Sequence, residues 1–155
     1  MRSKLSWREK LEKDQQPKLV EIPPKMARFG KGKMLIPTPM LVDELLRRIP
    51  KGKLVTVSEL RRKLAADFGA DVTCPLTTGI FVRIAAEAAE EDRANGRRRI
   101  APYWRVVKDD GSLNPKFPGG EKLQTRYLRD DGFSIVRKGN HVAVRDFVQR
   151  LTIFD

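Results

Sequence analysis

Apolar residues recur every three or four positions in several stretches of the chain, which is the spacing of amphipathic helices. Thr38 and Pro39 are typical of a helix start, so the first stretch predicts a helix that ends at Pro50. Ser58 is the predicted cap of a second helix over residues 59–68, and the longest helix is predicted over residues 75–95. The positions expected to be buried are Leu41, Leu45, Leu46 and Ile49, then Leu60, Leu64 and Phe68, then Leu76, Ile80, Phe81, Ile84 and Ala88.

Shorter elements lie between and after these helices. Residues 53–57 and 103–107 have the apolar, β-branched or aromatic character of strands, and the second runs into a turn at Asp109-Asp110-Gly111. A short helix is predicted over residues 121–129, and a hairpin is predicted through Gly139 and Asn140. The apolar residues of the tail, 147–154, fit either a helix or a strand.

This order of elements predicts an α+β fold, mainly helical, of the winged helix-turn-helix type with a C-terminal hairpin. The long helix is the expected groove-facing helix. Prolines and glycines exclude a long regular element near the N-terminus, so residues 1–36 are expected to form a basic arm or strap. We expect the domain itself over residues 37–133, with residues 134–155 packed on it as a hairpin and tail.

The charge of the chain points to a polyanionic partner. Lysine and arginine number 32 against 20 acidic residues, a formal net charge of +12. Contacts between such a surface and nucleic acid release counterions, so duplex DNA is the expected partner, and RNA or a ribosome is the alternative. The residues predicted to contact nucleic acid are Arg61, Arg62, Lys63, Thr77, Thr78, Gly79, Arg83, Arg97, Arg98 and Arg99. Four acidic residues of the long helix would repel phosphates if its C-terminal end approached the duplex: Glu87, Glu90, Glu91 and Asp92.

Composition excludes several other classes of function. The single Cys74 excludes an internal disulfide, and with the single His141 it leaves no metal centre of the Cys or His type, so neither metal nor cofactor is expected. No apolar stretch approaches the ~20 residues of a membrane helix, and the N-terminus is too charged for a secretion signal. We therefore expect a cytoplasmic protein. Cys74 directly precedes the long helix, where the helix dipole can make a thiol reactive, although free cysteines are most often buried.

Five segments, in order and spacing, resemble the C-terminal domain of the alkylguanine-DNA alkyltransferases, the methylated-DNA-protein-cysteine methyltransferases. They are residues 49–56, the Gly79-centred start of the long helix, residues 100–107 with their Asp-Gly-Ser turn, residues 118–120, and Leu128 with Gly132. The resemblance covers roughly residues 37–133. It implies a winged helix-turn-helix that binds duplex DNA through the minor groove and flips a damaged guanine into a pocket.

The reaction centre that the resemblance implies is chemically degenerate. In the family signature Pro-Cys-His-Arg-Val, the cysteine accepts the alkyl group, and Tyr103 stands in its place. Trp104 replaces the histidine of the signature, and an indole cannot act as a base. Arg105 matches the signature, and Asp131 keeps an acidic side chain at the position that orients the histidine in the family. The family's arginine finger falls at Pro75 and its phosphate-contacting tyrosine at Val57.

Three functions therefore stay open. The leading one is a non-enzymatic, alkyltransferase-like DNA-binding protein, linked to DNA repair or lesion recognition, in which Tyr103 and Trp104 fill the former reaction centre as core rings. The same two rings could instead line a cleft and stack on a base or a small ligand. The alternatives are a basic protein that binds RNA or the ribosome, and an enzyme of altered chemistry that uses Cys74 or a pocket at Tyr103.

Overall fold

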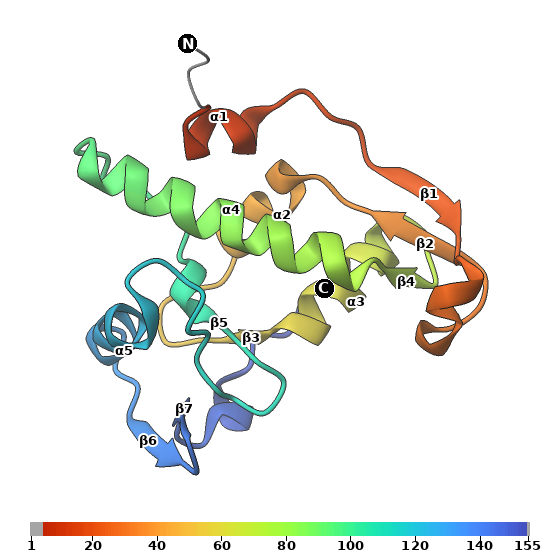
Figure 1. Cartoon of the computed structure of the whole chain (residues 1–155). Helices are drawn as coiled ribbons and strands as arrows, with labels where there is room; N and C mark the ends of the chain where they lie inside the picture. The colour runs from red at the N-terminus through yellow and green to blue at the C-terminus, as the bar shows by residue number, and fades with distance from the viewer. Residues whose placement is uncertain (1–4, 155) are drawn as a thin grey trace.

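The computed structural model describes residues 5–154 and shows a mixed α+β fold built around one long helix (Figure 1). The helices are α1 (Trp7–Glu12), α2 (Pro39–Leu46), α3 (Val57–Asp67), α4 (Pro75–Ala94) and α5 (Gly120–Asp130), with 3₁₀ helices η1 (Pro24–Phe29), η2 (Tyr103–Arg105) and η3 (Phe147–Arg150). The strands are β1 (Lys18–Glu21), β2 (Lys33–Ile36), β3 (Val55–Thr56), β4 (Val72–Thr73), β5 (Val106–Val107), β6 (Ile135–Lys138) and β7 (His141–Val144). The predicted fold class is confirmed.

Helix α4 crosses the middle of the molecule, and α1 and α2 pack against it (Figure 1). Its predicted buried stripe is wrong in the first two turns, because Leu76 and Ile80 are 69% and 57% exposed. The face that is buried instead consists mainly of small residues, which let the neighbouring helices approach closely. These residues are Thr78, Val82, Ala85, Ala86, Ala88, Ala89 and Asp92.

Helices α3 and α4 form the predicted helix-turn-helix. Gly69, at φ +66°, lies between α3 and β4, a conformation that glycine adopts without strain. The predicted start of α3 needs correction, because Thr56 rather than Ser58 is the cap: its side chain accepts from the Glu59 N–H at 3.2 Å. The predicted strand over 53–57 shortens to β3 as a result, since Val57 already belongs to the helix.

The segment predicted as a strand over 103–107 is a strand only at its end. Residues 103–105 form the 3₁₀ turn η2, in which the Arg105 N–H donates to the Pro102 carbonyl at 3.1 Å. Strand β5 follows and pairs in parallel with β3, Val55 with Val106. The turn places Tyr103 against both α4 and α5, and Trp104 against α5.

The N-terminal arm contains regular structure that the periodicity did not predict. Ser6 and Glu9 form a reciprocal capping box at the start of α1, whose Leu11 is fully buried against α4 and its neighbours. Strands β1 and β2 pair antiparallel, and β2 pairs in parallel with β4. Burial of Leu11 alone contributes about 2 kcal/mol.

The C-terminal hairpin is confirmed as β6 and β7, paired from Ile135 with Val144 to Lys138 with His141. The tail forms η3 and then returns to the domain, where Leu151 bridges Leu54.

Candidate nucleic-acid interface

Tyr103 is a fully buried core residue at the centre of a ring cluster. Its ring meets those of Trp104, Phe117 and Tyr127 edge-on, at centroid distances of 5.5, 5.4 and 6.2 Å. Its hydroxyl donates to Oε2 of Glu90, on α4, at 2.7 Å. The phenol is therefore held on all sides and does not border open space.

Glu90 joins two phenols. The Tyr127 hydroxyl, from α5, donates to the same Oε2 at 2.9 Å, and Arg93 in turn donates to that hydroxyl. Burial, and then the hydrogen bond to the Glu90 carboxylate, raise the pKa of Tyr127 to about 12. The same two causes also raise the pKa of Tyr103, so both phenols stay protonated well above neutral pH.

Asp131 holds the two residues that follow Tyr103. Its Oδ2 accepts from Trp104 Nε1 at 3.0 Å and from Arg105 Nε at 2.7 Å. Arg105 also donates to the Ile49 carbonyl at 2.8 Å, which ties the centre to the end of α2. The acidic position that the resemblance identified thus orients an indole and a guanidinium in place of an imidazole.

Gln124 on α5 was missed by the sequence analysis, although it is fully buried. Its amide donates to the carbonyls of Trp104 and Val106, and its Oε1 accepts from the Asn114 N–H at 2.9 Å. Glu90, Tyr127 and Phe117 were likewise not identified as part of the centre. No local signal marks these four residues, because they meet only through the packing of α4, α5 and the 117–120 loop on η2.

A cavity of only about 40 Å³ lies between α3, α4 and the centre. Val57 and Gly79 line it on the helix side, and Val106, Asn114 and Phe117 are among the residues on the other side. Cavities that bind ligands are commonly about 300–1,000 Å³. This one has room for about a single water molecule and is far too small for a nucleobase.

The first turns of α4 form an exposed surface, which we call the α4 front: Leu76, Thr77, Gly79, Ile80 and Arg83. Leu76, Gly79, Ile80 and Arg83 are exposed, and Thr77 is half-buried. Thr78 does not belong to this surface, because it is fully buried and its hydroxyl donates to the Cys74 carbonyl at 2.7 Å. Gly79 has open space where a side chain would be.

The acidic end of α4 is turned toward the protein's own groups. Glu91 accepts from the backbone N–H groups of Trp7 and Arg8 at 3.1 and 3.0 Å, and so caps α1. Asp92 is buried and pairs with Arg8 and, at 3.8 Å, with Arg97. With Glu90 bound to the phenols, these three carboxylates anchor the fold.

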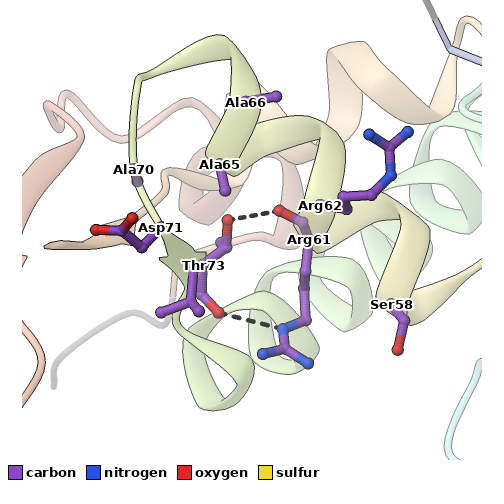
Figure 2. Close-up of a pocket in the computed structure, with 9 residues that line it drawn as sticks. Ser58, Arg61, Arg62, Ala65, Ala66, Ala70, Asp71 and Thr73 are labelled. Carbon is purple, nitrogen blue, oxygen red and sulfur yellow. Dashed lines mark hydrogen bonds between the residues drawn. The ribbon is translucent and has the colours of Figure 1, made fainter. Parts of the chain in front are cut away.

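The basic cluster of α3 is divided in the structure. Arg61 and Thr73 exchange two hydrogen bonds, from Arg61 Nε to the Thr73 carbonyl at 3.1 Å and from Thr73 Oγ1 to the Arg61 carbonyl at 2.7 Å (Figure 2). Arg62 points away from Arg61 and pairs with Glu59. Lys63 is buried and pairs with Asp67 at 2.9 Å, so it does not join the exposed cations as predicted.

Arg61, Arg62 and Ser58 border a shallow cavity of about 360 Å³ between α3 and β4 (Figure 2). It carries two guanidinium groups and one carboxylate, Asp71, which accepts from the Lys33 N–H. This cavity lies on the helix-turn-helix, with Arg61 and Arg62 at its edge.

The remaining predicted residues lie elsewhere. Arg97, Arg98 and Arg99 are exposed in the segment after α4. Cys74 is buried in a small apolar cluster with Met26 and Met34. Among residues 5–154 no group of His, Cys, Asp and Glu side chains is arranged to hold a metal ion, and no helix in that range is long and apolar enough to cross a membrane.

No known family model matches the sequence, and a search of curated proteins finds no match. Two solved structures have a similar fold. One is the S. pombe protein ATL in complex with DNA, with a TM-score of 0.54 and 18% identity, covering 74% of this chain and 94% of that one. The other is S. pombe Atl1 in complex with damaged DNA containing O6-carboxymethylguanine, with a TM-score of 0.52, 17% identity and the same coverage. The fold expected from the alkyltransferase resemblance is confirmed.

Proposed function

We propose that this protein binds duplex DNA through the α4 front and transfers no alkyl group. One observation carries the proposal: in an alkyltransferase-like fold, the position of the acceptor thiol is occupied by a buried phenol that is hydrogen-bonded to Glu90. Both solved structures of similar fold are complexes with DNA, one of them damaged, which supports the choice of partner.

Alkyl transfer is excluded by the chemistry of the centre. A nucleophile must be deprotonated and must reach the alkyl carbon. The raised pKa of Tyr103 keeps its oxygen protonated, and its full burial keeps that oxygen from any ligand. Trp104 supplies only an N–H donor, already bound to Asp131, and has no site that could accept a proton. Cys74 offers no substitute, because it lies within the Met26 and Met34 cluster.

The α4 front suits a groove of the duplex. Leu76 and Ile80 present exposed apolar surface one helical turn apart, and Gly79 allows a close approach of backbone. Arg83, one turn further along, and Arg61 and Arg62 on α3 provide cations for the flanking phosphates. Apolar contact in the groove with basic contact on both sides is the pattern of a minor-groove protein.

The structure argues against extrusion of a base into the domain. The cavity behind Gly79 is about 40 Å³, and Phe117 and Tyr103 fill the space beyond it. Any distinction between damaged and intact DNA then arises from the shape and deformability of the duplex at the lesion.

The test is a binding comparison by fluorescence anisotropy over a series of salt concentrations. The ligands are a plain duplex, the same duplex with one O6-methylguanine, and a folded RNA of equal charge. We expect tightest binding to duplex DNA, with an affinity that falls steeply with salt. Tighter binding to the RNA in matched salt would replace DNA by RNA as the partner.

Two variants locate the interface. Leu76→Ser is expected to weaken duplex binding without loss of stability, because the side chain is exposed. Arg83→Ala is expected to lower the salt dependence by about one phosphate contact. Arg137→Ala, an exposed arginine of β6, is the matched control and should bind as the parent does. Equal affinities for all four proteins would remove the α4 front from the interface.

Mass spectrometry of the protein after incubation with the methylated duplex tests the absence of transfer. We expect no gain in protein mass and an intact lesion. A stoichiometric gain of one methyl group would overturn this part of the proposal. A duplex with 2-aminopurine beside the lesion should show no rise in fluorescence on binding if the base stays stacked.

A further inference from the structure

Another cavity, of about 480 Å³, opens on a part of the surface to which α3 and α4 contribute no residue. It lies between the end of α2, the segment that follows α4, and η2. In Figure 1 this segment runs from the end of α4 back beneath the helix to η2. The cavity is lined by four arginines, Arg47, Arg98, Arg99 and Arg105, and by the indole of Trp104. Two apolar residues complete the lining. The cavity is shallow and open to the surface, and its volume falls in the range of small-molecule sites.

Two of the arginines are fixed in place by the fold. Arg47 Nε donates to Asp43 at 2.8 Å, and its Nη1 donates to the Arg99 carbonyl at 3.4 Å. Arg105 is held by Asp131 and by the Ile49 carbonyl. Asp43 and Asp131 are both nearly buried, so the carboxylates lie behind the guanidinium groups and none of them lines the cavity.

The other two arginines carry uncompensated charge. Arg98 and Arg99 are exposed, and neither forms an ion pair with any residue between 5 and 154. The carbonyl of Arg99 is anchored by Arg47, which restrains the segment that presents both side chains. Planar guanidinium groups in this arrangement match phosphate oxygens.

The indole of Trp104 adds an aromatic surface that cannot move freely. Its ring packs on Tyr127 at a centroid distance of 4.5 Å and a tilt of 31°, and its Nε1 is bound to Asp131. Part of the side chain remains exposed where it lines the cavity. A rigid aromatic ring next to phosphate-binding arginines is the combination that recognises a nucleotide, through stacking of the base and charge on the phosphate.

We propose that this cavity binds a nucleoside phosphate, with its base against Trp104 and its phosphate on Arg98 and Arg99. The nucleotide is either free or the terminal, unpaired nucleotide of a strand, since both present the same groups. The site is independent of the proposed duplex interface, because the two surfaces share no residue.

Isothermal titration calorimetry with AMP, ATP, a 5′-phosphorylated unpaired oligonucleotide and inorganic phosphate tests the proposal on the full chain. We expect saturable binding of at least one nucleotide ligand, with quenching of tryptophan fluorescence, and weaker binding of inorganic phosphate. Preference for the oligonucleotide over AMP and ATP identifies a strand end as the source, and the reverse preference identifies a free nucleotide. The absence of saturable binding by all three nucleotide ligands overturns the proposal, as does competition by inorganic phosphate equal to that of AMP.

The variant Arg98→Ala with Arg99→Ala should weaken nucleotide binding about tenfold or more, because two charge-assisted hydrogen bonds are lost. Both side chains are exposed, so the fold should persist, and circular dichroism checks this. Arg137→Ala with Lys138→Ala, on exposed β6, removes the same charge elsewhere and should bind nucleotide as the parent does. Equal losses in both double variants would reduce the effect to net charge and refute the site.

The two proposals fail separately. Leu76→Ser should weaken duplex binding and keep nucleotide binding, and the Arg98, Arg99 variant should weaken nucleotide binding and keep duplex binding. A parent protein that binds nucleotide and no duplex would leave this site standing while removing the α4 front as a DNA interface.

Discussion

The hydrogen bond between Tyr103 and Glu90 should hold the former reaction centre together, and Glu90→Ala measures its contribution. The substitution removes the acceptor of the Tyr103 hydroxyl, which is fully buried and has no other partner among the described hydrogen bonds. An unpaired buried polar group costs about 1–3 kcal/mol, and a hydrogen bond to a charged group contributes about 1.5–3 kcal/mol. Tyr127 is only half-buried and can bond to water instead.

We therefore expect Glu90→Ala to lower the free energy of unfolding by about 3 kcal/mol, which for a domain of this size lowers Tm by about 6–12 °C. Urea unfolding followed by circular dichroism gives the free energy. Glu87→Ala, on the same helix, is the matched control, since Glu87 makes no side-chain hydrogen bond or ion pair that the described residues show. It should change stability by less than about 0.5 kcal/mol.

A double-mutant cycle with Tyr103→Phe separates the hydrogen bond from the packing. Once the hydroxyl is gone, Glu90→Ala no longer leaves a buried donor unpaired, so the two substitutions together should cost about 1–2 kcal/mol less than their sum. Additive costs, within about 0.5 kcal/mol, would mean that Tyr103 is held by ring packing alone. The assignment of Glu90 as the anchor of the centre would then be wrong.

Three further predictions follow from the same contacts. The pKa of Tyr127 is about 12 and that of Tyr103 is also raised, so tyrosinate absorbance should be absent in the folded protein near pH 10. Unfolded tyrosines ionise at about pH 10. The stability that the two raised pKa values contribute is therefore complete below that pH, and it falls above it by about 1.4 kcal/mol per pH unit for each ring. Ionisation of both rings near pH 10 in the folded state would contradict this. Asp131→Asn removes the partner of the nearly buried Arg105 and should cost about 3 kcal/mol in urea unfolding, whereas a cost below about 1 kcal/mol would show that the Ile49 carbonyl suffices. Glu91→Ala removes the side chain that caps α1 and should speed cleavage by trypsin within residues 13–18, while Glu87→Ala should leave the rate unchanged.

The sequence predicts most of the helices, and it correctly places Ala88 of α4 inside, but it does not predict which face of the first turns of α4 is buried. Leucine and isoleucine dominate a hydrophobic pattern, so the pattern predicts that Leu76 and Ile80 are buried in the core. The chain instead buries alanines such as Ala85 and Ala89, because α1 and α2 both pack on that side and leave room only for small residues. Alanine carries almost no periodic signal, so only the tertiary packing distinguishes the two faces. The exposed pair then becomes the clearest feature of the proposed interface.

The partners of the acidic run are the other feature that the sequence does not predict. Three of the four carboxylates between Glu87 and Asp92 bind groups that are far away in the sequence: the phenols, the start of α1, and Arg8. These partners lie more than ten residues away, so no spacing rule could have paired them, whereas the pair of Asp92 with Arg97 is local. The Ser6 and Glu9 capping box, by contrast, is a local motif that the sequence does contain, and it could have predicted α1.

The acidic end of α4 and the α4 front thus have different roles. The C-terminal turns supply Glu90, Glu91 and Asp92, which hold the rings and the N-terminal arm. Among the described residues, the one side-chain hydrogen bond of the α4 front runs from Thr77 Oγ1 to the Cys74 carbonyl, at 3.5 Å. If α4 served only to form the core, exposed Leu76 and Ile80 would lower solubility and provide no benefit. Because serine at position 76 removes apolar surface without opening a cavity, loss of DNA binding at unchanged stability can arise only from contact with the ligand. Glu90→Ala, in contrast, should lower the stability of the protein, and it should weaken DNA binding only as a consequence of that loss. Measuring both variants by unfolding and by anisotropy therefore separates a binding surface from a structural one on a single helix.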